Sequence, residues 1–360
     1  MINKTFKNKK IIVTGHTGFK GSWLTAWLVM LGAKVIGISK NIPTKPSHFE
    51  ELKLKDKIEH HEIDIRNLNK LRRIFNLKKP DFVFHLAAQA LVKESYINPA
   101  YTIETNTIGT MNVLESLRFM KGKKNCTAVI ITSDKVYKNL EIKRGYTEKD
   151  ILGGKDPYSS SKASAEILIS SYINSFFPSE STNVLIGVAR AGNVIGGGDW
   201  SKNRLIPDCI KSWSKNKKVL LRSPTSTRPW QHVLEAIWGY LLLANKLKKT
   251  KKLHGESFNF GPDYYSSHSV LKVVKKKREY WGNISWEVKK NSKHKFFESN
   301  LLKLNSNKAK KFLGWKCKMN LSLTLKMVTE WYKYYYTNNK KNASMTYKQI
   351  QEYQKILQKK

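Results

Sequence analysis

Short apolar runs alternate along this chain with segments whose apolar residues recur at helical spacing. Six strand-like runs stand out, at 11–13, 33–39, 57–64, 81–88, 127–133 and 183–190. Between them lie helix-like segments such as 67–75, in which Leu68, Leu71 and Phe75 share one face. Strands separated by helices predict an α/β fold, a doubly wound parallel sheet covered on both faces by helices.

The pattern changes soon after residue 190. Glycine, proline and tryptophan then interrupt the chain in GGGDW, RSPTSTRPWQH and NFGPD, and helical segments become scattered. We therefore predict a sheet domain over 1–190 and a smaller, interleaved part over 191–336. The polar, lysine-rich residues 337–360 are expected to form an exposed helix or a frayed tail.

A glycine-rich turn follows the first strand. Gly15, Gly18 and Gly21 have the spacing GxxGxxG, and apolar residues over 23–31 continue as a helix that Gly32 would end. Such glycines let the main chain and the start of a helix approach a pyrophosphate closely. The order of strand, turn and helix predicts a dinucleotide site, although the turn could also simply join a strand to a helix.

Tyr158 and Lys162 stand four residues apart in YSSSK, on one face of a helix that Asp156 and Pro157 would start. Tyrosine is a poor base at neutral pH, but a nearby ammonium and a nicotinamide cation would favour its phenolate. It could then take a proton from a sugar hydroxyl while the carbon gives up hydride. The alternative is an incidental pair on an amphipathic helix.

Ser133, Asp134 and Lys135 end the strand-like run over 127–133, at the edge where open α/β sheets bind their ligands. Ser133 can hydrogen-bond a reacting hydroxyl. Asp134, if burial keeps it protonated, can give a proton to a leaving hydroxyl, and Lys135 can accept one if its pKa is depressed. The same residues would also make a plain turn, so the argument depends on three motifs in one α/β pattern.

The chain is strongly basic, with 66 Lys and Arg against 27 Asp and Glu and a net charge of +39. A basic surface attracts phosphate chains, which suggests nucleic acid. However, the lysines are spread along the chain without a zinc-finger spacing or an RNA-recognition signature. A lysine-rich proteome would give the same numbers, so we expect an anionic small molecule and no nucleic-acid partner.

The sequence lacks the usual signals of a membrane span, of secretion and of a metal site. No apolar run reaches the roughly 18–20 residues that cross a bilayer, and no apolar signal region precedes the first strand, so we expect a cytoplasmic protein without a membrane partner. Cys126, Cys209 and Cys317 are far apart and have no metal-ligand spacing, so we expect no metal.

Taken together, the motifs resemble the extended short-chain dehydrogenase/reductase family of NAD-dependent epimerases and dehydratases. The resemblance covers about residues 9–335 and includes GxxGxxG, HLAAQ, the serine after the fifth strand and YxxxK. Within the family, GHTGFKGSWL, ITSDKVY, GGKDPYSSSK and RAGNVIGGGDW are similar to segments of the branch that dehydrates CDP-sugars.

The resemblance implies roles for the residues that match the family's motifs. The cofactor site would comprise Gly15, Thr17, Gly18, Phe19, Lys20, Gly21, Asp64, Ile65, Ala87, Ala88, Gln89, Asn106, Tyr158 and Lys162. The catalytic set would be Ser133, Asp134, Lys135, Tyr158 and Lys162. The substrate-binding set would be Asn193, Arg204, Arg228 and His232.

The implied activity is dehydration of CDP-glucose to the 4-dehydro-6-deoxy sugar, a lyase reaction run by an internal hydride cycle on NAD. It would serve deoxysugar synthesis for surface polysaccharide such as lipopolysaccharide O-antigen. The alternatives are a dehydratase or epimerase for dTDP-, UDP- or GDP-sugars, and a non-catalytic dinucleotide sensor. The family often pairs two long helices, here about 95–120 and 157–177, so we expect a homodimer or homotetramer.

The chain departs from the family pattern at two places. Ser39 and Lys40 stand where an acid usually binds the adenosine ribose, and a lysine could meet a 2′-phosphate, so NADP remains an alternative to NAD. Asp134 and Lys135 stand where enzymes for dTDP-glucose carry Asp-Glu. The identity of the base at C5 of the sugar therefore stays open.

Overall fold

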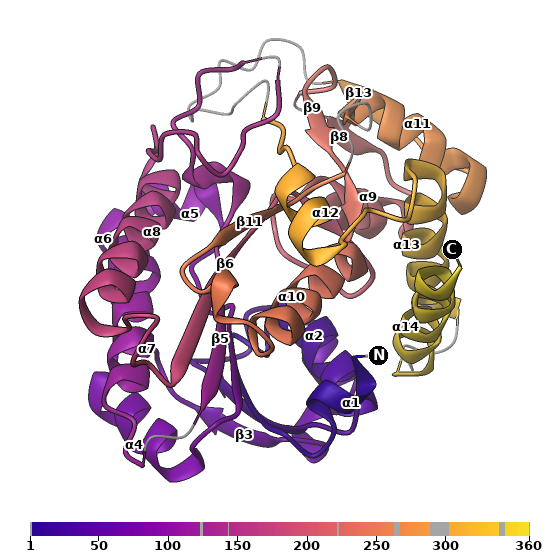
Figure 1. The fold of residues 1–360 in the computed structure, drawn as a ribbon. Coiled ribbons are helices and arrows are strands. Elements are labelled where there is room, and N and C mark those ends of the chain that lie inside the picture. Colours follow the sequence, from indigo (N-terminus) through magenta and orange to yellow (C-terminus); the bar gives the residue numbers. More distant parts are fainter. Residues whose placement is uncertain are drawn as a thin grey trace.

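The computed structural model describes residues 2–122, 125–142, 144–221, 223–262, 267–288, 302–337 and 343–359. The main sheet is formed by β1 (Lys10–Thr14), β2 (Lys34–Ser39), β3 (Glu59–Glu62), β4 (Phe82–His85), β5 (Cys126–Ile131), β6 (Val184–Ala191) and β11 (Ser257–Phe260). These strands are all parallel, in the order β11-β6-β5-β4-β1-β2-β3 (Figure 1). The order reverses between β1 and β4, which is where open α/β sheets hold their ligands. The predicted doubly wound fold is confirmed.

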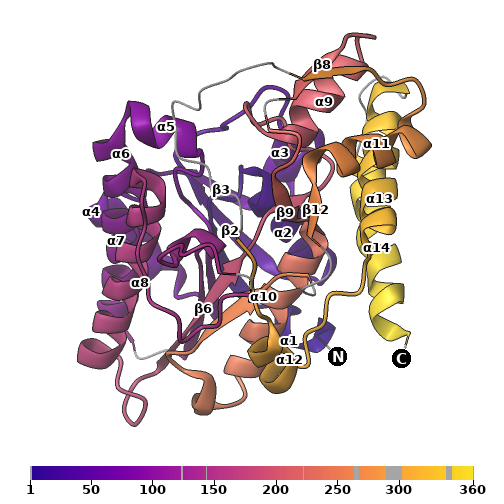
Figure 2. The same ribbon diagram turned by 90° about the horizontal axis from the view of Figure 1, so that it is seen from above.

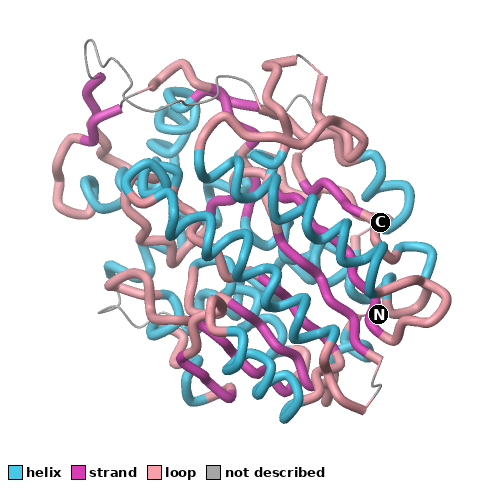
Figure 3. The backbone as a smooth tube through the Cα atoms, turned by 90° about the vertical axis from the view of Figure 1, so that its left-hand side faces the viewer, coloured by secondary structure: helices cyan, strands magenta, loops and turns pink. Residues whose placement is uncertain are grey.

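Neighbouring side chains along each strand face two separate cores. In β1, Ile11 and Val13 belong to one core and Ile12 to the other, as the two-residue period of a strand requires. The first core is covered by α1 (Asn3–Phe6), α2 (Phe19–Met30) and α10 (Val233–Leu247), and the second by α4 (Leu68–Lys78), α7 (Gly109–Arg118) and α8 (Pro157–Phe176). Figure 3 shows the strands lying between the two sets of helices.

One of the two long helices expected from the sequence is broken. The range 95–120 contains α5 (Val92–Ile97), α6 (Pro99–Ile103), the π-helical turn η2 (Glu104–Ile108) and then α7. Pro99 cannot continue α5, and the side chain of Asn98 accepts a hydrogen bond from Tyr101 N at 3.1 Å to start α6. The other long helix is present as α8, which Asp156 caps by accepting from Ser159 N at 3.0 Å.

The part beyond residue 191 is interleaved with the sheet domain. Its strand β11 extends the sheet beside β6, and its helix α10 covers one face. Short strands pair outside the sheet: β7 (Val194–Ile195) with β10 (Gln231–His232), β9 (Thr227–Pro229) with β12 (Ser267–Ser269), and β8 (Val219–Leu221) with β13 (Trp286–Val288). The remaining elements are α3 (His48–Glu51), η1 (Leu54–Asp56), η3 (Asp134–Val136), α9 (Leu205–Trp213), η4 (Lys251–Leu253), α11 (Val270–Trp281), α12 (Asn307–Leu313), α13 (Leu321–Thr337) and α14 (Ala343–Gln358).

The C-terminal segment is a docked helix, which corrects the expectation of an exposed helix or a frayed tail. Helix α14 lies beside α13 and reaches α2, and Ile350 and Tyr353 are fully buried (Figures 1 and 2). The hydroxyl of Tyr353 donates to Glu235 Oε2 at 2.6 Å. Burial raises the pKa of Glu235, whose other oxygen accepts from the backbone of Lys318 and Met319. This apolar face is not evident from the sequence, because polar residues and lysines are interspersed through the segment.

The described residues contain neither a membrane-spanning helix nor a metal-binding cluster. Among the helices of this part of the chain, none has the length and apolar character needed to span a membrane. The same residues contain no cluster of three or more His, Cys, Asp or Glu that could hold a metal ion.

Replacing Tyr353 by Phe should destabilise the protein by about 1–3 kcal/mol, because it leaves a buried carboxylate without one of its donors. Urea unfolding of the full chain measures this difference. Tyr347→Phe is the matched control, since that hydroxyl accepts from the exposed Lys57 Nζ at 3.0 Å rather than donating to a buried carboxylate. Equal stability of the two variants would show that α14 is not held by Glu235.

Candidate active site

Two of the three glycines in the turn after β1 are required by the packing of the protein itself. Gly15 has a φ of +75°, and a Cβ there would lie 2.7 Å from Ala87 N. A Cβ on Gly21 would lie 2.0 Å from the carbonyl oxygen of Gly15. At Gly18 the nearest atom would be that same oxygen, at 3.4 Å, so the protein leaves room there. A glycine at a roomy position suits close approach of a ligand to the main chain.

The start of α2 is open to an anion. Gly18 is its N-cap and supplies no side-chain hydrogen bond. Beside it, Thr17 Oγ1 donates to the carbonyl of Asn41 at 2.7 Å, which fixes the loop after β2. Phe19 and Lys20 form the first turn of the helix. Because the N–H groups of a first helical turn need acceptors, these residues fit the pyrophosphate of a dinucleotide.

The predicted catalytic residues of β5 and α8 come together. Ser133 Oγ donates to Asp134 Oδ1 at 2.9 Å, and Ser133 also lies within hydrogen-bonding reach of Tyr158. Asp134, Tyr158 and Lys162 are all buried, with 3%, 8% and 6% of their surfaces exposed. A carboxyl group thus adjoins the serine–tyrosine pair in a site largely shielded from water.

Burial controls the proton affinities of Tyr158 and Lys162. It raises the pKa of Tyr158 to about 12, against the opposing effects of the Ser133 hydrogen bond and the Arg204 charge. It lowers the pKa of Lys162 to about 8, helped by Lys20 and opposed by Glu166. The phenol is therefore protonated at neutral pH in this structure, and its activation requires the further positive charge that a bound nicotinamide would bring.

Lys20 lies near Asp134 and near two further cations, Arg204 and Lys162. Burial lowers the pKa of Lys20 to about 8, the Arg204 charge lowers it further, and Asp134 opposes both. Lys20 also acts on Lys162. The sequence placed Lys20 beside the cofactor, whereas the structure also places its charge among the catalytic groups. This excess of positive charge suits an anionic substrate.

Lys135 lies on a different side of the same turn. It is half-buried in η3 and lines a small hollow with Asp156 and Ser159 at the start of α8. Its backbone N–H donates to Ser133 Oγ at 3.2 Å. Lys135 and Lys20 thus both flank the catalytic turn, and either can be considered as the base for the sugar C5 hydrogen.

The region expected to face the adenosine is rich in paired charges. Asp64 accepts two hydrogen bonds from Arg66 Nε, at 3.1 and 3.3 Å, and lies 3.6 Å from Lys40 Nζ. Both cations lie over the ring of Tyr101, at 5.0 Å for Lys40 and 4.8 Å for Arg66. The side chain of Ile65 is buried in the second core, so only its backbone could face the adenine.

The loop after β4 is braced rather than open. Asn106, in the π-helical turn η2, is fully buried. Its oxygen accepts from Gln89 N at 2.8 Å, and its nitrogen donates to Gln89 O at 3.0 Å and to Ser161 Oγ at 2.8 Å. The amide therefore joins this loop to α8, while the half-buried Ala87 and Ala88 form its accessible part.

The four predicted substrate residues differ in access. Asn193, Arg204 and Arg228 are half-buried, and Arg204 Nη1 donates to Asp199 Oδ2 at 3.1 Å. His232 is fully buried instead, and burial lowers its pKa to about 3. Its Nδ1 accepts from Leu234 N at 3.3 Å as the cap of α10. His232 thus starts a helix through Nδ1, while its buried Nε2 has no hydrogen-bond partner among the described residues, so the expected substrate contact stays a prediction.

The sequence analysis missed a buried ion pair behind the site. Arg190 Nε donates to both oxygens of Glu166 at 2.9 Å, and Arg190 Nη1 donates to Tyr137 OH at 2.8 Å. Thr132 Oγ1, next to the catalytic serine, donates to Glu166 Oε1 at 2.5 Å. The available signal was the spacing of Glu166, which follows Lys162 by one helical turn.

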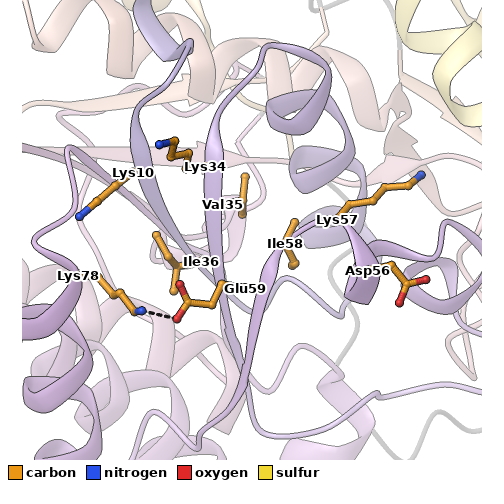
Figure 4. A pocket seen from close by; sticks show the side chains of 9 residues that line it. All are labelled: Lys10, Lys34, Val35, Ile36, Asp56, Lys57, Ile58, Glu59 and Lys78. Atoms are coloured by element: carbon orange, nitrogen blue, oxygen red, sulfur yellow. Dashed lines mark ion pairs between the residues drawn. The ribbon is translucent and has the colours of Figure 1, made fainter.

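A surface hollow of about 420 Å³ lies at the opposite edge of the sheet (Figure 4). Its lining includes Lys10 and Lys34, the first residues of β1 and β2, and Lys78, which pairs with Glu59. Since the catalytic residues follow the other ends of the strands, this hollow is not part of the site.

The fold and the site together define a dinucleotide-binding protein of the short-chain dehydrogenase/reductase class. The family model described as GDP-mannose 4,6 dehydratase matches residues 12–328. The chain belongs to this family, and the resemblance seen in the sequence is confirmed.

Individual relatives agree with this assignment. The chain is 46% identical over 340 residues to CDP-glucose 4,6-dehydratase of Salmonella typhimurium, covering 92% of this chain and 93% of that protein. It is 27% identical to CDP-paratose 2-epimerase of Salmonella typhi, covering 75% and 84%. The structure of UDP-glucose 4-epimerase from Thermotoga maritima with UDP-glucose superposes with a TM-score of 0.75 at 25% identity, covering 90% and 98%.

Glu166→Gln should destabilise the protein by about 3–5 kcal/mol, because it leaves the Arg190 guanidinium buried without its counter-charge. Denaturant unfolding measures the loss. Glu330→Gln is the control, since its pair with Lys326, at 3.8 Å, is exposed and should contribute little. Similar stability of both variants would mean that the buried pair does not hold the site together.

Proposed function

We propose that this protein removes water from CDP-glucose to give CDP-4-dehydro-6-deoxyglucose, with NAD as its cofactor. The observation that carries the proposal is the buried Asp134 carboxyl, bonded to Ser133 beside Tyr158. An enzyme that only oxidises and reduces a sugar needs the serine and the tyrosine but has no leaving hydroxyl to protonate. The 46% identity to a CDP-glucose 4,6-dehydratase supports the same substrate.

Different side chains of this protein would carry out the separate proton transfers. Tyr158 would take the proton of the sugar 4-hydroxyl, with Ser133 holding that oxygen. The chemistry that NAD supplies when bound is acceptance of the C4 hydride and its later return to C6, so that net oxidation is zero. The C4 ketone acidifies the hydrogen on C5, which a lysine would remove as a proton and return to C5 when the hydride reaches C6. Asp134 would give its proton to the departing 6-hydroxyl.

Either Lys20 or Lys135 would remove the hydrogen on C5 of the sugar. Lys135 matches the family position of the base, and Lys20 has its pKa lowered to about 8 while its charge meets Asp134. Arg204 would bind the substrate diphosphate, with Arg228 and Asn193 on the same part of the chain. A guanidinium is well suited to a phosphate because it offers parallel donors.

The residues expected to face the adenosine of the cofactor suit NAD better than NADP. Asp64 lies 3.6 Å from Lys40 and binds Arg66, which also donates to Glu104 Oε2 at 2.8 Å, so the two cations there are already balanced by two carboxylates. A 2′-phosphate on the ribose would have to displace or approach that negative charge. Ser39 Oγ lies 3.0 Å from His16 Nδ1 and accepts from Thr17 N at 3.4 Å, so this serine is engaged in holding the turn.

The exposed faces of α6, η2 and α8 support self-association. Four apolar side chains there remain more than a third exposed: Ile103, Ile108, Ile167 and Phe176. Contiguous exposed apolar groups on adjacent helices favour an interface between copies, so we include a homodimer, or a homotetramer built from it, in the proposal. A cytoplasmic place in deoxysugar synthesis for surface polysaccharide would accord with a soluble nucleotide-sugar substrate.

Incubation with CDP-, dTDP-, UDP- and GDP-glucose in the presence of NAD tests the proposal. Mass spectrometry should show loss of one water from CDP-glucose and from none of the others at a comparable rate. Tyr158→Phe should abolish this turnover, because it removes the phenol that takes the 4-hydroxyl proton, while NAD still binds.

Other outcomes would identify the rivals. Conversion of another nucleotide sugar would change the substrate, and a product of unchanged mass would indicate an epimerase. Binding of NAD with no turnover of any sugar would indicate a dinucleotide sensor, and near-normal activity of Tyr158→Phe would contradict the mechanism.

A further inference from the structure

The glycine-rich loop after β7 is clamped between aromatic side chains. A Cβ on Gly197 would lie 2.0 Å from the Trp331 ring, and a Cβ on Gly198 would lie 2.5 Å from the His48 ring. On the other side, Trp23 Nε1 donates to Gly197 O at 2.8 Å. The loop therefore has little conformational freedom, and the course of its backbone depends on the positions of those three rings.

The clamped loop leads directly into the support of Arg204. Asp199 is buried, with 4% exposed, and Tyr332 OH donates to its carbonyl at 2.6 Å and accepts from its N–H at 3.0 Å. The Asp199 side chain accepts from Ser201 N at 3.0 Å and from Arg204 Nη1 at 3.1 Å. The guanidinium is thus held by a residue whose own backbone is fixed by α13.

The hydroxyl of Thr346, in the C-terminal helix α14, contacts both Trp331 and His48, the two rings that pack against the glycine-rich loop. Thr346 Oγ1 accepts from Trp331 Nε1 at 2.9 Å and lies 2.9 Å from His48 Nε2. All three residues are buried, with at most 2% exposed. One turn further on, Gln349 Nε2 donates to Met327 O at 2.7 Å, which ties α14 to α13.

We propose that α14, through Thr346, is a positioning element for Arg204 and hence for the diphosphate of the nucleotide-sugar substrate. This inference rests on the proposed function, in which Arg204 binds that diphosphate. Thr346 and Tyr332 touch neither substrate nor reacting atoms, so they are positioning residues. Their effect arises because a guanidinium held in its binding geometry loses less conformational freedom when the ligand arrives.

The position of Arg204 also matters for the chemistry around it. Its charge reaches Tyr158 and Lys20, so a displaced guanidinium would alter the groups that face the sugar as well as the diphosphate. The larger effect should still fall on substrate binding, because Arg204 itself takes no proton. Loss of the support should therefore raise KM more than it lowers kcat.

Thr346→Val keeps the volume of the side chain and removes its hydroxyl. We expect the KM for CDP-glucose to rise about three- to tenfold, with kcat within about twofold and the KM for NAD unchanged, since a lost hydrogen bond has an effect of this size. Thr346→Ser should restore the KM. Ser344→Ala, on the same helix but at an exposed hydroxyl beside Tyr334 OH, should leave every constant unchanged.

A second variant and a binding measurement complete the test. Tyr332→Phe keeps the ring and removes both hydrogen bonds to Asp199, so it should raise the KM for CDP-glucose in the same way. This variant tests the support of Arg204 if Thr346→Val does not fold. Calorimetry with CDP needs no turnover, and the same weakening should appear in the Kd. Folded Thr346→Val and Tyr332→Phe with the wild-type Kd for CDP would overturn the inference. Wild-type protein that binds CDP without dehydrating CDP-glucose would overturn the proposed function alone.

Discussion

The buried ion pair between Glu166 and Arg190 is the constraint on which the site depends. It joins α8 to β6, and Thr132 adds the end of β5 through its bond to Glu166. Removing one partner of such a pair leaves an unpaired charge in the interior, so the three elements are strongly held in one arrangement. Tyr158 and Lys162 lie on α8, and Ser133 follows β5. The pair therefore sets the distance between the tyrosine and the serine before any ligand binds.

The site also carries an excess of positive charge. The charges of Arg204, Lys20 and Lys162 lie close enough to repel one another, since Arg204 acts on Lys20 and Lys20 acts on Lys162, and burial lowers the pKa of both lysines to about 8. An anionic ligand would relieve the repulsion among these cations, so the site is better matched to a nucleotide diphosphate than to a neutral sugar. The strongly basic composition of the whole chain does not create this property. It arises where a few side chains from α2, α8 and α9 converge.

Much of the fold could be predicted from the sequence because it rests on local patterns. The six strands of the βαβ series, the glycine turn and the start of α8 at Asp156 each depend on residues close together in the chain. The strand β11 was missed, since it has only four residues and runs into the turn signal NFGPD. The break at Pro99 was visible as a proline, but the expected helix over 95–120 rests on the family's paired helices rather than on the local sequence.

The residues that position the site were harder to predict because their partners are distant in sequence. Glu166 and Arg190 look like two ordinary charged residues until β5, β6 and α8 are packed together. The docked face of α14 was hidden because the segment 337–360 as a whole is polar and lysine-rich, so its burial became visible only in the folded chain. For His232 the structure adds a role that the family motif did not indicate, since the imidazole caps α10 through Nδ1.

The central claim is that hydride moves from C4 to C6 within one substrate molecule, and isotope labelling tests it most directly. CDP-glucose carrying deuterium at C4 should give a dehydrated product with that deuterium in the C6 methyl group, as seen by NMR and mass spectrometry. A dehydrated product without deuterium at C6, or a product that keeps it at C4, would contradict the account.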